Sequence, residues 1–92
     1  MIQSYRTAGN TDEQVVCTRR CLVYSITPEL TTTGTVTLRD DATAGGSNIK
    51  HVSAIGLTQA GKTFPRGVLF ERGVTVKLSA ATDLTLITFE PV

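Results

Sequence analysis

The sequence has few aromatic residues and no long apolar run. It contains no tryptophan, and phenylalanine and tyrosine together make up 5% of its residues. A flat aromatic platform of the kind that stacks sugars or nucleic-acid bases is therefore not expected. No apolar stretch is long enough to span a bilayer, and the first residues lack the apolar run of a secretion signal. We expect no membrane partner and no passage through a membrane.

Charge of one sign is not concentrated anywhere in the chain. The formal net charge is +1, with lysine and arginine scattered among aspartate and glutamate. Proteins that bind nucleic acid carry a basic patch or stripe, and nothing in this sequence marks one. We therefore expect no nucleic-acid partner.

Residues that perform chemistry are also scarce. The only histidine, His51, has no carboxylate or nucleophile near it in sequence. The only adjacent acidic pair is Asp40-Asp41, and neighbouring residues on a strand point to opposite faces. The loop that follows lacks the alternating oxygen ligands and closing glutamate of a calcium site. We expect no catalytic residue, no metal and no cofactor, and an enzyme would need a site formed between subunits.

Cys17 and Cys21 are separated by Thr18-Arg19-Arg20. On one straight strand their side chains would lie ~13 Å apart, too far for a disulfide. A loop over residues 18–20 would instead bring them face to face. The absence of a secretion signal favours two reduced thiols in or near the core.

The sequence is rich in alternating apolar and polar residues. The clearest case is 74–79, where the apolar side chains of Val74, Val76 and Leu78 share one face of a strand. A turn at 80–83 precedes a second strand, which places Leu84 and Leu86 opposite Thr85, Ile87 and Phe89. Because this last strand is apolar on both faces, we expect another layer or subunit to cover it. Its apolar residues form the expected oligomer interface: Leu84, Leu86, Ile87 and Phe89.

Five further strands are expected, at 13–17, 21–27, 35–39, 49–57 and 63–69. In the second of these, Leu22, Tyr24 and Ile26 share a face, and in the third Val36 and Leu38 point inward. No helical apolar period occurs. The sequence therefore predicts a single small antiparallel β-sandwich or jelly-roll-like domain of about seven short strands over residues 13–92. Residues 1–12 are predicted to be an arm or irregular lead-in.

One short echo occurs within the chain. Arg66-Gly67-Val68 is repeated as Arg72-Gly73-Val74. Six residues are too few for a repeat architecture. We expect two similar bends, in which each glycine adopts a backbone angle that other residues resist. A recognition tripeptide is the alternative.

Several of these stretches together resemble a family of known proteins. The segment from Phe64 to Val76, FPRGVLFERGVTV, is followed by a strand that ends in Thr88-Phe89-Glu90. With the earlier segments TGTVTLRD at 33–40 and CLVYSI at 21–26, it resembles the small β-sandwich proteins encoded among the structural genes of tailed bacteriophages. The cysteine pair is not part of that pattern.

The resemblance implies a virion protein of the capsid decoration or cement type. Such a protein would be assembled in the host cytoplasm and bound at the capsid surface. It would form a homo-oligomer, with a trimer expected, and would bridge neighbouring copies of the major capsid protein. The residues expected to contact the partner are Asp40, Asp41, Asn48, Lys62, Arg66 and Arg72.

Two other structural roles are open. A receptor-binding, adhesin-like module of a head fibre or tail would use the loops at 40–48 and 58–66. A connector of the tail or neck would form a ring of more subunits than a trimer. These alternatives differ from the cement role in their partner and in their oligomeric state.

Overall fold

The computed structural model describes residues 1–29, 34–46, 48–55, 62–79 and 84–92, without the side chains of residues 51–55. These residues form eight strands and, within the described ranges, no helix, so none that could span a membrane. The strands are β1 (Gln3–Arg6), β2 (Gln14–Cys17), β3 (Cys21–Pro28), β4 (Gly34–Arg39), β5 (Ile49–Ile55), β6 (Lys62–Phe70), β7 (Val74–Leu78) and β8 (Thr85–Pro91). The turn expected at 80–83 and residues 58–61 of the expected loop lie outside the described residues.

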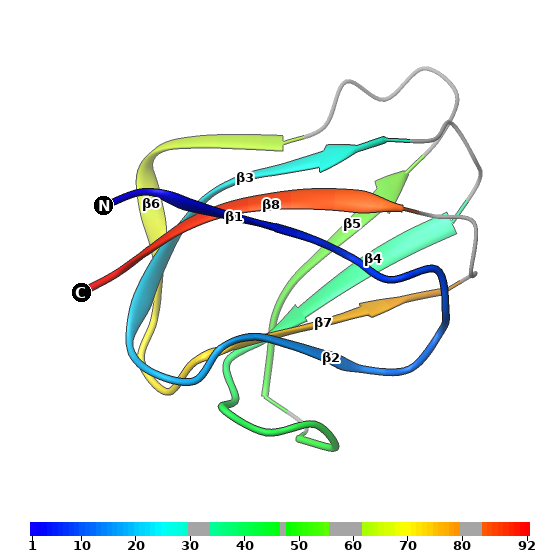
Figure 1. The fold of residues 1–92 in the computed structure, drawn as a ribbon, viewed down its shortest axis with the longest axis horizontal. Helices are drawn as coiled ribbons and strands as arrows, with labels where there is room; N and C mark the ends of the chain where they lie inside the picture. The colour runs from blue at the N-terminus through cyan, green and yellow to red at the C-terminus, as the bar shows by residue number, and fades with distance from the viewer. Residues whose placement is uncertain (30–33, 47, 56–61, 80–83) are drawn as a thin grey trace.

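The strands form two four-stranded antiparallel sheets packed as a sandwich (Figure 1). Sheet A has the order β1-β8-β3-β6 and sheet B the order β2-β7-β4-β5. The pairing is nested, because β1 pairs with β8, β2 with β7, β3 with β6 and β4 with β5. The chain is thus one long hairpin rolled up so that β8 also meets β3 and β7 also meets β4. This is a jelly roll, and the predicted fold class is confirmed with eight strands in place of about seven.

The additional strand is β1, in the segment expected to be an arm or irregular lead-in. Residues Gln3–Arg6 pair with β8 at the edge of sheet A, so this part of the segment belongs to the sandwich. The backbone of Thr7 donates to the carbonyl of Thr85 at 2.9 Å, and the Thr85 amide donates to the Thr7 hydroxyl at 2.9 Å. Of the strand's side chains only Tyr5 packs against the core. Backbone pairing therefore defines β1, which explains why apolar periodicity does not show it.

The core lies between the two sheets, where the alternation predicted for β4, β7 and β8 is confirmed. Val36 and Leu38 are fully buried, as are Val76 and Ile87. The buried apolar cluster consists of Cys17, Cys21, Val23, Ile26, Val36, Leu38, Phe70, Val74, Val76, Leu78, Ile87 and Phe89. These side chains come from both sheets, so the core holds the two layers of the sandwich together.

In strand β3 the alternation of core-facing and outward-facing residues is interrupted. Leu22, Tyr24 and Ile26 were expected to share a face, but the structure buries Ile26 with Val23 and leaves the other two half-buried. The pairing with β8 shifts between Val23 and Ser25, where β3 holds one extra residue. Such a β-bulge reverses the inward and outward positions beyond it. The prediction for this strand was wrong because the bulge depends on the partner strand.

The two echoed Arg-Gly-Val segments are both bends, as expected. Gly67 has φ +78° and Gly73 has φ +152°, conformations that residues with a Cβ rarely adopt. Gly67 lies in edge strand β6, two residues after Pro65. Proline and a bend at this place leave the edge poorly suited to pairing with another strand.

Candidate functional site

One end of the sandwich carries the connections 18–20, 40–48 and 71–73. Antiparallel strands reverse direction at each step, so the ends of β2, β4 and β6 meet there. In Figure 1 the turns 18–20 (blue) and 71–73 (yellow) lie side by side at the lower left, with the β4–β5 loop below them. We call residues 18–20, 40–46, 48 and 71–73 the turn end. It contains four of the predicted partner-contact residues: Asp40, Asp41, Asn48 and Arg72.

Asp40 fastens the β4–β5 loop to the β6–β7 turn. Its carboxylate accepts hydrogen bonds from the backbone amides of Glu71 at 3.2 Å and Arg72 at 2.8 Å. Its own amide donates to the carbonyl of Asn48 at 2.8 Å, which closes the loop. A carboxylate that accepts backbone amides is a strong, charge-assisted partner. The Asp40 carboxylate is therefore used in contacts within the chain rather than in contacts with a ligand.

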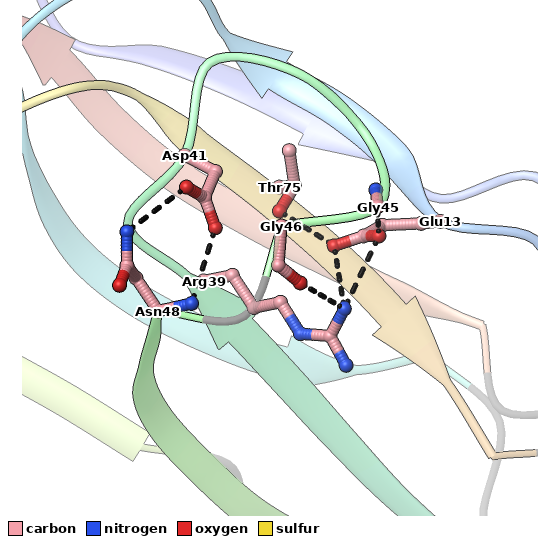
Figure 2. Close-up of polar contacts among 7 residues, drawn as sticks. All are labelled: Glu13, Arg39, Asp41, Gly45, Gly46, Asn48 and Thr75. Atoms are coloured by element: carbon pink, nitrogen blue, oxygen red, sulfur yellow. Dashed lines mark hydrogen bonds and ion pairs between the residues drawn. The ribbon is translucent and has the colours of Figure 1, made fainter.

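Asp41 closes the same loop from within. Its carboxylate accepts the Asn48 side-chain amide at 3.1 Å and the Asn48 backbone amide at 3.3 Å (Figure 2). Asp40 and Asp41 thus do come together with Asn48, but as a structural loop closure.

A second polar cluster holds the loop down on the outer face of sheet B (Figure 2). The Glu13 carboxylate accepts the amide of Gly45 at 2.6 Å, the hydroxyl of Thr75 at 2.9 Å and the Arg39 guanidinium at 3.2 and 3.3 Å. Arg39 also donates to the carbonyl of Gly46 at 2.7 Å. Thr75 is fully buried although its side chain faces away from the core between the sheets. The loop and Glu13 together cover it.

The electrostatics of this cluster favour the ionised carboxylate. Burial by itself raises the pKa of Glu13. The hydrogen bonds from Gly45 and Thr75 and the attraction of Arg39 outweigh that effect and leave the pKa below its ordinary value of 4.5. Glu13, which precedes β2, is thus an ionised carboxylate that links Arg39 of β4, Thr75 of β7 and Gly45 of the β4–β5 loop. Sequence reasoning missed Glu13, Arg39 and Thr75, since no spacing or pattern relates them.

Gly73 marks the place where three segments meet. A Cβ built there would lie 2.5 Å from the carbonyl oxygen of Cys17 and 2.9 Å from the Cα of Ala42. Real Cβ atoms do not approach that closely, so only glycine lets the β6–β7 turn pack against the end of β2 and the β4–β5 loop. The turn end is therefore held by close packing as well as by hydrogen bonds.

Cys17 and Cys21 are free, buried thiols beneath the turn end. The Cys17 thiol donates to the carbonyl of Arg19 at 3.4 Å. Burial, and then the neighbouring Cys17 thiol, raises the pKa of Cys21 to about 12. Such a thiol is protonated at neutral pH and is a poor nucleophile and metal ligand.

The remaining predicted site residues lie elsewhere. Lys62 is exposed at the far end of β6, opposite Ile26, and Arg66 is exposed in the middle of that strand. Ile87 and Phe89 belong to the core of this one chain, at 0% and 5% exposure. The prediction that they form an oligomer interface is wrong, because the second sheet already covers them. Leu84 and Leu86 are half-buried.

The described residues present a closed surface. No pocket opens among them, and they hold no group of three or more histidine, cysteine or acidic side chains placed to bind a metal ion. What this arrangement offers is a set of ordered turns on a rigid body. Comparison with protein-family models found none that matches the chain, and comparisons with curated proteins and with solved structures gave no match either.

Proposed function

We propose that the chain is a non-enzymatic structural protein of a phage virion. It decorates the capsid as a homo-oligomer and stabilises it by bridging neighbouring copies of the major capsid protein. The observation that carries the proposal is the turn end, in which internal hydrogen bonds and close packing order the connections before any partner arrives. A binding surface that is already ordered loses little conformational entropy on association.

The fold is compatible with this role but does not establish it. Jelly rolls occur in viral capsid proteins and also in lectins and cupins, and a fold hosts many functions. The resemblance of residues 64–76 and 33–40 to phage structural proteins favours the capsid among these. Recognition of sugars receives less support, because no aromatic residue lies in the connections of the turn end.

The mechanism requires no reaction. A protein that binds only the expanded capsid lattice stabilises that lattice by mass action, by ~2.7 kcal/mol per site at a hundredfold excess over its dissociation constant. Repeated over the shell, this free energy opposes the internal pressure of packaged DNA. A jelly roll suits the role because its paired strands connect one capsid contact to the next directly, with no flexible linker between the two contacts that could stretch under load.

Co-sedimentation with phage heads tests the proposal. The heads come from the phage whose genome encodes the chain, in expanded and unexpanded forms. We expect the chain to sediment with expanded heads and to remain in the supernatant with unexpanded ones. Binding to host cells and to neither form of head would refute the cement role in favour of the receptor-binding module.

Light scattering tests the oligomer. Ile87 and Phe89 are core residues and cannot support an oligomer. The expectation of an oligomer rests on the resemblance and on exposed apolar side chains at the sheet edges, such as Val15 and Ile49. At tens of micromolar we expect a mass that is a multiple of 9.8 kDa, with a trimer preferred. A monomer would contradict bridging by an oligomer, and a larger ring would favour the connector.

A further inference from the structure

Two thiols enter the core from opposite sheets beneath the turn end. Cys17 is the last residue of β2 in sheet B, and Cys21 is the first residue of β3 in sheet A. Both belong to the buried apolar cluster between the sheets, as do the residues that pair with them, Val74 and Phe70. Only residues 18–20 separate the two cysteines along the chain. Both thiols therefore lie at the place where the chain crosses from one sheet to the other (Figure 1).

The contacts of the Cys17 thiol direct it toward Cys21. Its sulfur lies 3.4 Å from the carbonyl oxygen of Arg19, which is halfway between the two cysteines in sequence. The Cys17 side chain therefore leans over the turn that leads to Cys21. In agreement with this position, burial and then the neighbouring Cys17 thiol raise the pKa of Cys21 to about 12.

The backbone beside the thiols is held in place from outside the turn. The carbonyl oxygen of Cys17 lies against Gly73 so closely that a Cβ there would be 2.5 Å away. The carbonyl of Arg20 accepts the amide of Val92 at 3.0 Å. Two reacting groups that are held near each other combine far faster than the same groups on a freely moving chain.

The two thiols differ in their access to solvent. Cys17 is 8% exposed and Cys21 is 0% exposed. The susceptibility of a cysteine to oxidation depends on its exposure. A small oxidant should therefore react first at Cys17 and leave Cys21 as the second, resolving thiol.

We propose that Cys17 and Cys21 are a redox-sensitive pair, which hydrogen peroxide converts into a disulfide that joins sheet B to sheet A beneath the turn end. The Cys17 sulfur attacks one peroxide oxygen. The S–O bond forms as the O–O bond breaks, and the leaving hydroxide takes the thiol proton and departs as water. The product at Cys17 is a sulfenic acid.

Cys21 completes the reaction. Its sulfur attacks the sulfenic sulfur of Cys17, the S–S bond forms as the S–O bond breaks, and the hydroxide leaves with the Cys21 proton as a second water. Two thiols lose two electrons in total, and one peroxide is reduced to two waters. The assignment goes beyond the proposed function and is independent of it, because it concerns only the chemistry of this chain.

The disulfide adds a covalent link where the two sheets are otherwise connected by the turn 18–20. A crosslink of this kind stabilises the folded state by restricting the unfolded chain. Its loop is short, so the gain lies toward the low end of the range for disulfides. The reduced and oxidised forms are thus expected to differ in stability while keeping the same fold.

Mass spectrometry of the folded wild-type protein tests the bond. After treatment with hydrogen peroxide we expect a loss of about 2 Da, the mass of two hydrogen atoms, and recovery of the original mass with dithiothreitol. Trypsin cleaves after Arg19 and Arg20, which lie between the cysteines. The peptides that carry Cys17 and Cys21 should therefore stay joined in the oxidised protein and separate on reduction.

Single serine variants assign the two roles. In C21S the sulfenic acid at Cys17 has no resolving thiol, so dimedone should trap it there. In C17S the buried Cys21 thiol should remain unmodified under the same treatment. Labelling of Cys21 in C17S at the rate of Cys17 in C21S would overturn the order of the two steps.

Thermal unfolding followed by circular dichroism tests the consequence for stability. We expect oxidation to raise the melting temperature of wild type by about 8–16 °C, from the entropy of a loop this short in a domain of this size, and dithiothreitol to reverse the rise. The control, C17S/C21S, should respond to neither reagent.

Four results with wild type, which require no variant to fold, would overturn the assignment. They are two thiols that stay free in the folded protein under peroxide, disulfide-linked dimers in place of the internal bond, a disulfide that forms only in urea, and a melting temperature that oxidation leaves unchanged or lowers. None of these outcomes depends on whether the chain binds a capsid.

Discussion

Replacement of Glu13 by alanine should destabilise the protein strongly, although the residue lies outside the apolar core. The change removes the acceptor of the Gly45 amide and the Thr75 hydroxyl, and it leaves the Arg39 guanidinium without its carboxylate. The Glu13 and Arg39 side chains are only 9% and 21% exposed, so water replaces little of what is lost. Thr75 is fully buried and would lose its only hydroxyl partner among the contacts found in the described residues.

The magnitude follows from these contacts. A hydrogen bond to a charged group contributes roughly 1.5–3 kcal/mol, and removing one partner of a buried ion pair costs about 3–5 kcal/mol. The contacts share one carboxylate and are not additive, so we expect a loss of about 3 kcal/mol in the free energy of unfolding. For a domain of this size that lowers the melting temperature by about 12–24 °C.

The pair formed by Arg6 and Glu29 provides the control. Its atoms are closer, at 2.7 Å, but its side chains are 69% and 28% exposed. An exposed ion pair contributes less than about 1 kcal/mol, so E29A should have a small effect. Urea titration followed by far-UV circular dichroism measures both variants. If E29A destabilises as much as E13A, distance rather than burial governs these contacts and the reasoning is refuted.

Three further outcomes are expected. G73A should lower the free energy of unfolding by about 3 kcal/mol, because its Cβ would lie 2.5 Å from a carbonyl oxygen and its φ is positive. G45A, with φ +90° and open space around it, should cost only about 1–2 kcal/mol. The lowered pKa of Glu13 stabilises the folded state above pH 4.5, and this contribution is lost as the pH falls below 4.5 through the folded-state pKa. The stability of E13Q, measured by urea titration, should therefore change less than that of wild type over that range. Because the pKa of Cys21 is raised to about 12, iodoacetamide at neutral pH should alkylate it only after unfolding, as mass spectrometry would show.

Each of these outcomes has a clear opposite. Equal losses for G73A and G45A would mean that the turn end is not closely packed at Gly73. A wild-type stability that follows E13Q through the acid range would mean that Glu13 has an ordinary pKa in the folded state. Rapid alkylation of Cys21 in the native protein would mean that the thiol is accessible or ionised, contrary to its burial.

The sandwich itself was predictable because strands packed between two layers alternate in sequence. Val36 with Leu38 and Val76 with Leu78 follow that rule, since each strand has one face against the opposite sheet. The rule fails where a strand is defined by backbone pairing, as in β1, or holds an extra residue, as β3 does at Tyr24. Both features depend on a partner strand far away in sequence.

The turn end was predictable only in part. Residues near one another in sequence, such as Asp41 and Asn48, could be assigned to one loop. The link between Glu13 and Gly45 depends on the loop folding back over sheet B, and no local pattern encodes it. The sequence shows that Ile87 and Phe89 are apolar but not whether the core or an interface takes them up, because the amount of core that two sheets enclose is not visible from composition.

Thermal release of DNA from expanded heads, with and without the added chain, is the most direct test of capsid stabilisation. The chain should raise the temperature at which DNA escapes, in proportion to the number of copies bound. An unchanged release temperature when the sites are saturated with wild-type protein would contradict the claim that this jelly roll strengthens the shell.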